Sequence, residues 1–215
     1  MPRESKTAKT QRAQRIAVGL RALYPAECAL THGNPFQLLV ATILSAQCTD
    51  ERVNQVTPTL FANYPDAESF ASARQRDLEK LIYSTGFFRA KSKSIIGASR
   101  ALVRDHGGKV PRTLSDLIEL PGIGRKTANV VLGTAFGIAE GVVVDTHVGR
   151  LARRMGLTRN RDAVKVEHDL MALLPDSEWV EFSHRMIWHG RRICLARKPL
   201  CDSCAIRPDC PRIGV

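Results

Sequence analysis

Four of the six cysteines in this 215-residue chain lie close together near its C-terminus, in the spacing C-x6-C-x2-C-x5-C. They are Cys194, Cys201, Cys204 and Cys210. One C-x2-C pair flanked by longer gaps differs from the two such pairs usual in structural zinc sites, and from the C-x2-C-x2-C-x3-C run of ferredoxins. The spacing therefore predicts a metal-binding segment and leaves zinc and an iron–sulfur cluster equally open. Cys28 and Cys48 lie outside it, and we expect them to be buried thiols.

The start of the chain does not resemble an export signal. Residues 1–15 read MPRESKTAKTQRAQR and lack an apolar core segment. No apolar run approaches the roughly 20 residues that span a bilayer, so we expect no membrane association. A cytoplasmic chain is predicted, associated with the nucleoid if its source is bacterial, in a reducing compartment that disfavours disulfides. The basic residues at the start are expected to form a short solvated tail rather than a transit peptide.

The charge balance favours a polyanionic partner. Lysine and arginine outnumber aspartate and glutamate by 32 to 21, which gives a net charge of +11. Such a surplus suits nucleic acid, although solubility alone would also account for it. Its distribution favours nucleic acid, because residues 86–126 hold nine basic side chains against three acidic ones.

Apolar residues recur at helical spacing along most of the chain, so the predicted fold class is all-α. Thr113 is expected to cap a short helix, and Gly137 to follow the end of another. The longer helices are expected at residues 72–83, 89–106, 125–136, 147–155, 162–174 and 178–193. The run Val142–Val144 is the one candidate strand, and it is too short to carry a sheet.

The stretch LPGIGRKTANVVL, Leu120 to Leu132, joins two of these helices through a Gly-x-Gly turn. Gly122 and Gly124 allow the backbone to approach a ligand, and the next helix offers free N–H groups and the positive end of its dipole. Arg125 and Lys126 would complete an anion site. The spacing fits neither the Walker P-loop nor the dinucleotide fingerprint. A plain tight turn between helices stays open as the alternative.

With these residues in view, the chain resembles endonuclease III. LPGIGRKTA is similar to the helix-hairpin-helix of DNA glycosylases, and VVVDTHVGR places Asp145 at the distance beyond Lys126 that this family expects. The four cysteines have the family's spacing for a [4Fe–4S] cluster. LLVATILSAQCTD, residues 38–50, resembles an early helix that ends in a DNA-probing glutamine, Gln47. The resemblance extends from about residue 34 to residue 210.

The resemblance implies roles for Lys126 and Asp145. Lys126 would attack the sugar C1′ of a damaged nucleotide, expel the base and form a Schiff base, and β-elimination would then cut the strand. Lysine suits this role because its amine, unlike a guanidinium, can lose its proton in a protein. Asp145 precedes a helix and is expected to cap it; the resemblance adds stabilisation of the oxocarbenium-like sugar and help with proton transfer.

The resemblance also implies how the DNA is held. Gln47 would fill the gap left by the extruded nucleotide, and Phe87 would wedge between bases. A core position is the alternative for Phe87. Arg197 and Lys198 lie between the first two cysteines and would bind a phosphate, or stabilise the negatively charged cluster together with Arg191 and Arg192. Cys48 replaces the usual alanine, and its effect is not predicted.

The implied architecture has two helical lobes with the DNA cleft between them. Residues 29–139 would form a barrel lobe with the helix-hairpin-helix, and residues 1–28 plus 140–215 would form a lobe with Asp145 and the cluster. The implied protein is a monomeric bifunctional DNA glycosylase and AP lyase, which excises oxidised pyrimidines from double-stranded DNA in base excision repair and also acts at abasic sites.

Two alternative functions remain from the sequence. The first is a monofunctional adenine-type glycosylase of the same superfamily, but those relatives lack the hairpin lysine and carry a further C-terminal domain. The second is a non-catalytic DNA-binding module, which would not need Lys126 and Asp145 together.

Overall fold

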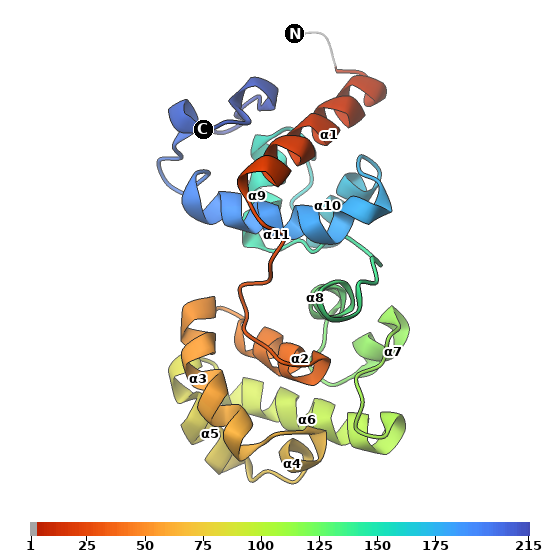
Figure 1. The fold of residues 1–215 in the computed structure, drawn as a ribbon, viewed down its shortest axis with the longest axis vertical. Coiled ribbons are helices and arrows are strands. Elements are labelled where there is room, and N and C mark those ends of the chain that lie inside the picture. Colours follow the sequence, from red (N-terminus) through yellow and green to blue (C-terminus); the bar gives the residue numbers. More distant parts are fainter. Residues whose placement is uncertain (1–3) are drawn as a thin grey trace. The chain divides into compact units, whose positions relative to one another are not determined.

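The computed structural model describes residues 4–215, and these residues form helices joined by turns and loops (Figure 1). The prediction of an all-α fold is confirmed, since no strand is present among the described residues. Val142 and Val143 of the candidate strand are buried in a segment that is neither helix nor strand. The chain divides into two compact units. One is Cys28–Ile138, and the other combines the N-terminal segment up to Glu27 with Ala139–Val215.

The unit Cys28–Ile138 is built around α2, which contacts α3, α6 and α8. Every residue from Leu38 to Leu44 is buried, so this part of α2 is covered on all sides, as expected of a central helix. The long helix α6 lies beside α4 and α5 (Figure 1). The elements are α2 (Pro35–Leu44), α3 (Asp50–Asn63), α4 (Ala67–Ala71), α5 (Gln75–Ile82), the short 3-10 helix η1 (Tyr83–Thr85), α6 (Phe88–His106), α7 (Leu114–Glu119) and α8 (Arg125–Phe136).

The second unit has its own core, in which α11 contacts both α1 and α9. Phe182 and Met186 of α11 are buried there with Ile16 and Leu20 of α1. Its elements are α1 (Lys6–Leu23), α9 (Thr146–Arg154), α10 (Ala163–Met171), α11 (Asp176–Arg192) and the short 3-10 helices η2 (Cys201–Ser203) and η3 (Arg207–Asp209). No helix of the described residues is both long and apolar enough to cross a membrane.

The prediction of a solvated basic tail is only partly right. Residues 1–3 lie outside the described residues, residues 4–8 are exposed, and the chain is helical from Lys6 onward. Ser5 caps α1 by accepting a hydrogen bond from the Ala8 N–H, and the helix continues for 18 residues. The Arg12 side chain donates to the carbonyl oxygens of Met155 and Asp209. The basic composition of this segment favours a solvated tail, but tertiary contacts hold the segment in place.

Several other helix boundaries differ from the predictions. The helix expected at residues 162–174 ends at Met171, and the helix expected from residue 178 begins at Asp176. The helix expected from residue 72 begins at Gln75, because α4 ends at Ala71 and a short link follows it. The helix expected to end at Gln47 ends three residues earlier, at Leu44, so Gln47 lies in a turn. The predicted boundaries of α6 and α8 agree with the structure to within one residue, and Thr113 caps α7 as expected.

Candidate functional site

The Gly-x-Gly hairpin joins α7 to α8 within the unit Cys28–Ile138. The Thr113 side chain accepts the N–H of Asp116 at the start of α7, and the Ile123 N–H donates to the Leu120 carbonyl across the turn. Gly122 has a φ of +78°, and a Cβ built on it would lie 2.5 Å from the Cβ of Ser94 in α6. Only glycine fits here without strain, so the sequence of the turn fixes how the hairpin packs on α6.

Gly124 has a different role from Gly122. It precedes α8 with an ordinary φ of −95°, and nothing lies within 4 Å of a Cβ built on it. No side chain caps α8, and its first turn carries no acidic residue. The N–H groups at this helix start are therefore open to an anion. Arg125 is half-buried and Lys126 is exposed beside them, so the hairpin presents an amine next to an anion-binding helix start.

Gln47 lies in the turn between α2 and α3, with its side chain exposed. Its φ of +53° is in the left-handed region, which a residue with a side chain rarely adopts. The turn is held by the Cys48 N–H, which donates to the Ser45 carbonyl, and by Thr49, whose side chain caps α3. A polar side chain is thus held outside the core on a strained backbone.

Phe87 lies at the start of α6 with 63% of its surface exposed, so the alternative that it is a core residue is wrong. Its φ of +46° is also left-handed. Within residues 4–215, the non-glycine residues with positive φ are Gln47, Phe87, Lys198 and Arg212. The first three are residues that the sequence predicts to contact DNA. Such backbone costs roughly 1–3 kcal/mol per residue and is concentrated at binding sites.

Asp145 caps α9 as predicted, because its carboxylate accepts the N–H of Val148 at 2.8 Å. The side chain is half-buried, and His147, two residues further on, lies against Arg150. Burial lowers the pKa of His147, so its ring is neutral near pH 7. Asp145 belongs to the second compact unit, whereas Lys126, Gln47 and Phe87 all belong to the first.

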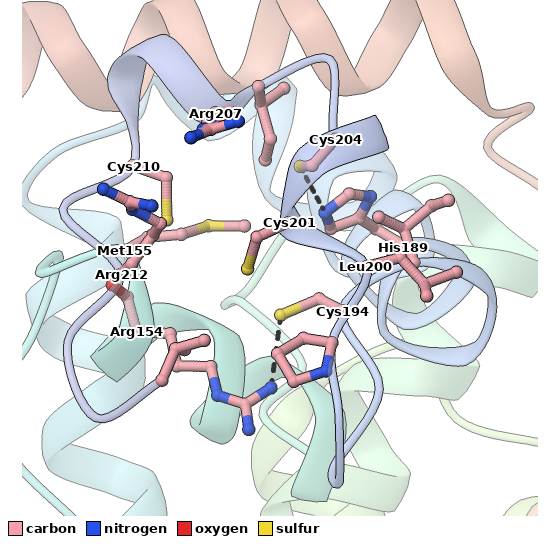
Figure 2. Close-up of a pocket in the computed structure, with 14 residues that line it drawn as sticks. Arg154, Met155, His189, Cys194, Leu200, Cys201, Cys204, Arg207, Cys210 and Arg212 are labelled. Atoms are coloured by element: carbon pink, nitrogen blue, oxygen red, sulfur yellow. Dashed lines mark hydrogen bonds between the residues drawn. The ribbon is translucent and has the colours of Figure 1, made fainter.

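The four clustered cysteines surround one cavity in the second unit (Figure 2). All are half-buried free thiols, with Cys194 following α11, Cys201 in η2 and Cys210 following η3. Burial raises the pKa of the thiols of Cys204 and Cys210, so their thiolates need a positive partner such as a metal. Among the described residues, no three histidine, cysteine or acidic side chains are close enough together to hold a single metal ion.

Two side chains from α9 and α11 bond to the cysteine sulfurs. Arg154 donates to Cys194 Sγ at 3.4 Å and to the Leu195 carbonyl at 2.6 Å. His189 Nε2 lies 3.6 Å from Cys204 Sγ (Figure 2). The Nδ1 of His189 is hydrogen-bonded to the Tyr24 hydroxyl at 3.1 Å. Burial lowers the pKa of His189 to about 4, so the ring is neutral at pH 7. These partners would hold two sulfurs in fixed positions.

The cations at the cavity are not the ones expected from the sequence. Arg154, Arg207 and Arg212 line it (Figure 2), and none of them was predicted. Of the expected group, Arg191 and Arg192 lie over the Trp188 ring, and Arg197 and Lys198 are exposed in the loop. The reason is that tertiary packing brings Arg154 to the cysteines from 40 residues away in the sequence. Cations that are close to the cysteines in the sequence are therefore not the cations that line the cavity.

The two remaining cysteines were expected to be buried, and the structure shows them only partly buried. Cys28 and Cys48 are half-buried and pack against the edge of the core of the unit Cys28–Ile138.

The chain matches the family model described as HhH-GPD superfamily base excision DNA repair protein over residues 40–176. Among curated relatives, it is 55% identical to an endonuclease III of a Synechocystis species over 95% of this chain and 94% of the relative. It is similar to a solved non-covalent endonuclease III–DNA complex, with 41% identity, a TM-score of 0.90, and coverage of 94% and 95% of the two chains.

A second solved structure is a trapped endonuclease III–DNA covalent intermediate. The chain matches it with 40% identity and a TM-score of 0.90, covering 94% of this chain and 96% of the other. The fold, the hairpin, the cysteine cavity and these likenesses agree: the chain belongs to the endonuclease III family within the HhH-GPD superfamily of base excision DNA repair proteins.

Proposed function

We propose that this chain is a bifunctional DNA glycosylase and AP lyase that removes oxidised pyrimidines in base excision repair, with Lys126 as its nucleophile. The observation that carries the proposal is the position of Lys126, exposed on the first turn of α8 beside a helix start that no side chain caps. A lysine is a poor structural choice there, because it faces the positive end of the helix dipole. An anionic strand bound at the same helix start would offset that cost.

The chemistry assigned to Lys126 has two stages. Nζ forms a bond to C1′ while the glycosidic bond breaks; the departing base keeps the bonding electrons and gains a proton, and the nitrogen gives up a proton. The C1′–O4′ bond then breaks as O4′ gains a proton, and the nitrogen lone pair forms the C=N bond of a Schiff base between Nζ and C1′. Loss of a proton from C2′ and cleavage of the C3′–O bond complete β-elimination and cut the strand.

Asp145 is proposed to stabilise the positive charge that develops on the sugar and to assist proton transfer. Its contact with the Val148 N–H supports this role, because a carboxylate held by a backbone donor has a fixed direction. The capping and catalytic roles use the same orientation and do not compete.

Binding of the duplex is proposed to involve both the hairpin and the two strained turns. The open N–H groups at Gly124 and the side chain of Arg125 would hold a phosphate. Gln47 would hydrogen-bond to the base left without a partner, and Phe87 would fill the stack, since the target nucleotide must leave the helix to reach Lys126. The exposed Arg197 and Lys198 would bind a second phosphate.

The cofactor is proposed to be a [4Fe–4S] cluster held by Cys194, Cys201, Cys204 and Cys210. Four thiols around one cavity fit this group. The single C-x2-C pair flanked by longer gaps differs from the two such pairs usual in structural zinc sites. The bound cluster would supply a cross-link that fixes residues 194–210. The relatives are bacterial proteins, so the cytoplasm, where bacterial DNA lies, is the proposed location.

The test is borohydride trapping on a duplex with one oxidised pyrimidine, with an abasic duplex as a second substrate. The wild-type protein should form a stable adduct with both. Lys126→Gln should abolish adduct and base release while binding to undamaged duplex survives, because Gln keeps most of the size and polarity of the side chain. Lys80→Gln, an exposed lysine on α5, is the matched control and should trap normally. Near-normal base release by Lys126→Gln would reduce Lys126 to a phosphate contact.

A further inference from the structure

Lys91 is a buried lysine in α6 that joins two turns of the unit Cys28–Ile138. Only 4% of its surface is exposed. Its Nζ donates to the Leu44 carbonyl and to the Thr85 carbonyl, both at 2.7 Å. No carboxylate is among its partners in the described part of the chain. The ammonium group is therefore buried against the backbone oxygens of residues 44 and 85, which are 41 residues apart in the sequence.

Each of these carbonyls lies just before one of the strained residues. Leu44 is the last residue of α2, three positions before Gln47. In a continued helix its carbonyl would accept the Cys48 N–H, but that N–H bonds to Ser45 instead. Thr85 ends η1, two positions before Phe87. The backbone N–H of Lys91 also donates to the Phe87 carbonyl at 3.0 Å. Lys91 thus bonds to the backbone of both turns.

We propose that Lys91 is a positioning residue that fixes the Gln47 turn and the Phe87 turn relative to each other, so that both side chains enter the duplex together. This inference rests on the proposed roles of Gln47 and Phe87. Filling one gap in the stack from two turns requires that the turns keep a constant separation, and a misplacement of about 1 Å can cost on the order of 100-fold in rate. A three-donor group between two carbonyls provides that constraint.

The chemistry of the site supports a positioning role over simple filling of the core. Burial lowers the pKa of Lys91, which means that the charged form pays a desolvation penalty. A methionine would occupy similar space without that penalty. It would leave two buried carbonyls without donors, and both turns would lose their link. The ammonium also lies at the C-terminal end of α2, where the helix dipole favours a cation.

The test separates duplex probing from chemistry by using two substrates. The first is a duplex with one oxidised pyrimidine, and base release is measured in a single turnover. The second is a single strand with one abasic site, where no stack has to be opened, and strand cleavage is measured. Lys91→Met should slow the first reaction about tenfold and change the second less than about twofold. Lys80→Met, with 77% of its side chain exposed, is the matched control and should change neither.

The decisive comparison places Lys91→Met in the Gln47→Ala/Phe87→Ala background. If Lys91 acts through those residues, it should slow duplex base release no further there. A full tenfold loss of duplex rate in that background would overturn the inference about Lys91, and so would equal losses of rate on both substrates. Either result would leave the proposed roles of Gln47 and Phe87 standing. No loss of duplex base release from Gln47→Ala/Phe87→Ala itself would refute the proposed roles of these residues, and the inference with them.

If Lys91→Met does not fold, Lys91→Arg replaces it in the same comparisons. Its guanidinium keeps the charge and the donors but is larger, so it should retain folding and part of the duplex rate. The loss of rate caused by Lys91→Arg should again be confined to the duplex substrate. It should be absent in the Gln47→Ala/Phe87→Ala background. Equal losses on both substrates would overturn the inference.

Discussion

Gly122 of the hairpin turn packs directly against Ser94 of α6, with no room for a side chain between them. Gly122→Ala should therefore push the hairpin off α6 and also strain the backbone, since alanine at a φ of +78° costs roughly 1–2 kcal/mol. We expect a lower melting temperature and weaker binding to both damaged and undamaged duplexes, because the phosphate site moves. Differential scanning fluorimetry and equilibrium binding would measure the two effects.

Gly124→Ala is the control for that prediction. Gly124 has negative φ and open space where a Cβ would lie, so alanine should leave the melting temperature close to wild type. Equal destabilisation by the two substitutions would show that Ser94 does not restrict the turn.

Local signals were enough to predict several elements of the fold from the sequence. Thr113 and Asp145 are caps with a side-chain oxygen, and both were placed at helix starts from residue type and position alone. Gly137 follows the end of α8 with a left-handed φ, as a glycine after an apolar helical stripe predicts. These features depend on neighbours within four residues, so the sequence carries them directly.

Features that depend on distant neighbours were missed. The start of α1 is held by Arg12 through the carbonyl oxygens of Met155 and Asp209, which no local pattern indicates. In the sequence Lys91 is one cation of the basic segment 86–126, yet in the structure it is buried. The left-handed backbone of Gln47 and Phe87 is not indicated by residue type, since neither type favours it. The signal available for Lys91 was its place among apolar positions of α6.

The cysteine cavity predicts a protein with about four irons per chain and a brown colour. Cys201→Ser should lose iron and stability together, because a cluster that cross-links residues 194–210 contributes to folding. Iron content by plasma emission and the visible absorption spectrum would measure the first effect, and thermal unfolding the second. Cys28→Ser, outside the cavity, should keep its iron. One zinc and no iron in the wild-type protein would contradict the cluster assignment.

Arg197 and Lys198 should contribute to affinity without contributing to base preference. Both are exposed, and a pair of phosphate contacts accounts for a slope of about 2 in a plot of log binding constant against log salt concentration. Arg197→Ala/Lys198→Ala should reduce the slope by that amount and leave the ranking of damaged bases unchanged. Arg76→Ala/Lys80→Ala removes the same charge from α5 and is the control. An unchanged slope in the first variant would exclude the pair from the DNA interface.

Asp145 allows its two roles to be separated by the choice of substitution. Asn caps a helix about as well as Asp, because its side-chain oxygen can accept the Val148 N–H in the same way. Asp145→Asn should therefore keep the melting temperature of the wild type while base excision falls by orders of magnitude, since the amide carries no negative charge to stabilise the sugar. Asp145→Ala should lose the excision and also about 1 kcal/mol of stability with the cap. Single-turnover base release and thermal unfolding of the two variants distinguish these effects. Near-normal excision by Asp145→Asn would leave Asp145 as a helix cap and no more.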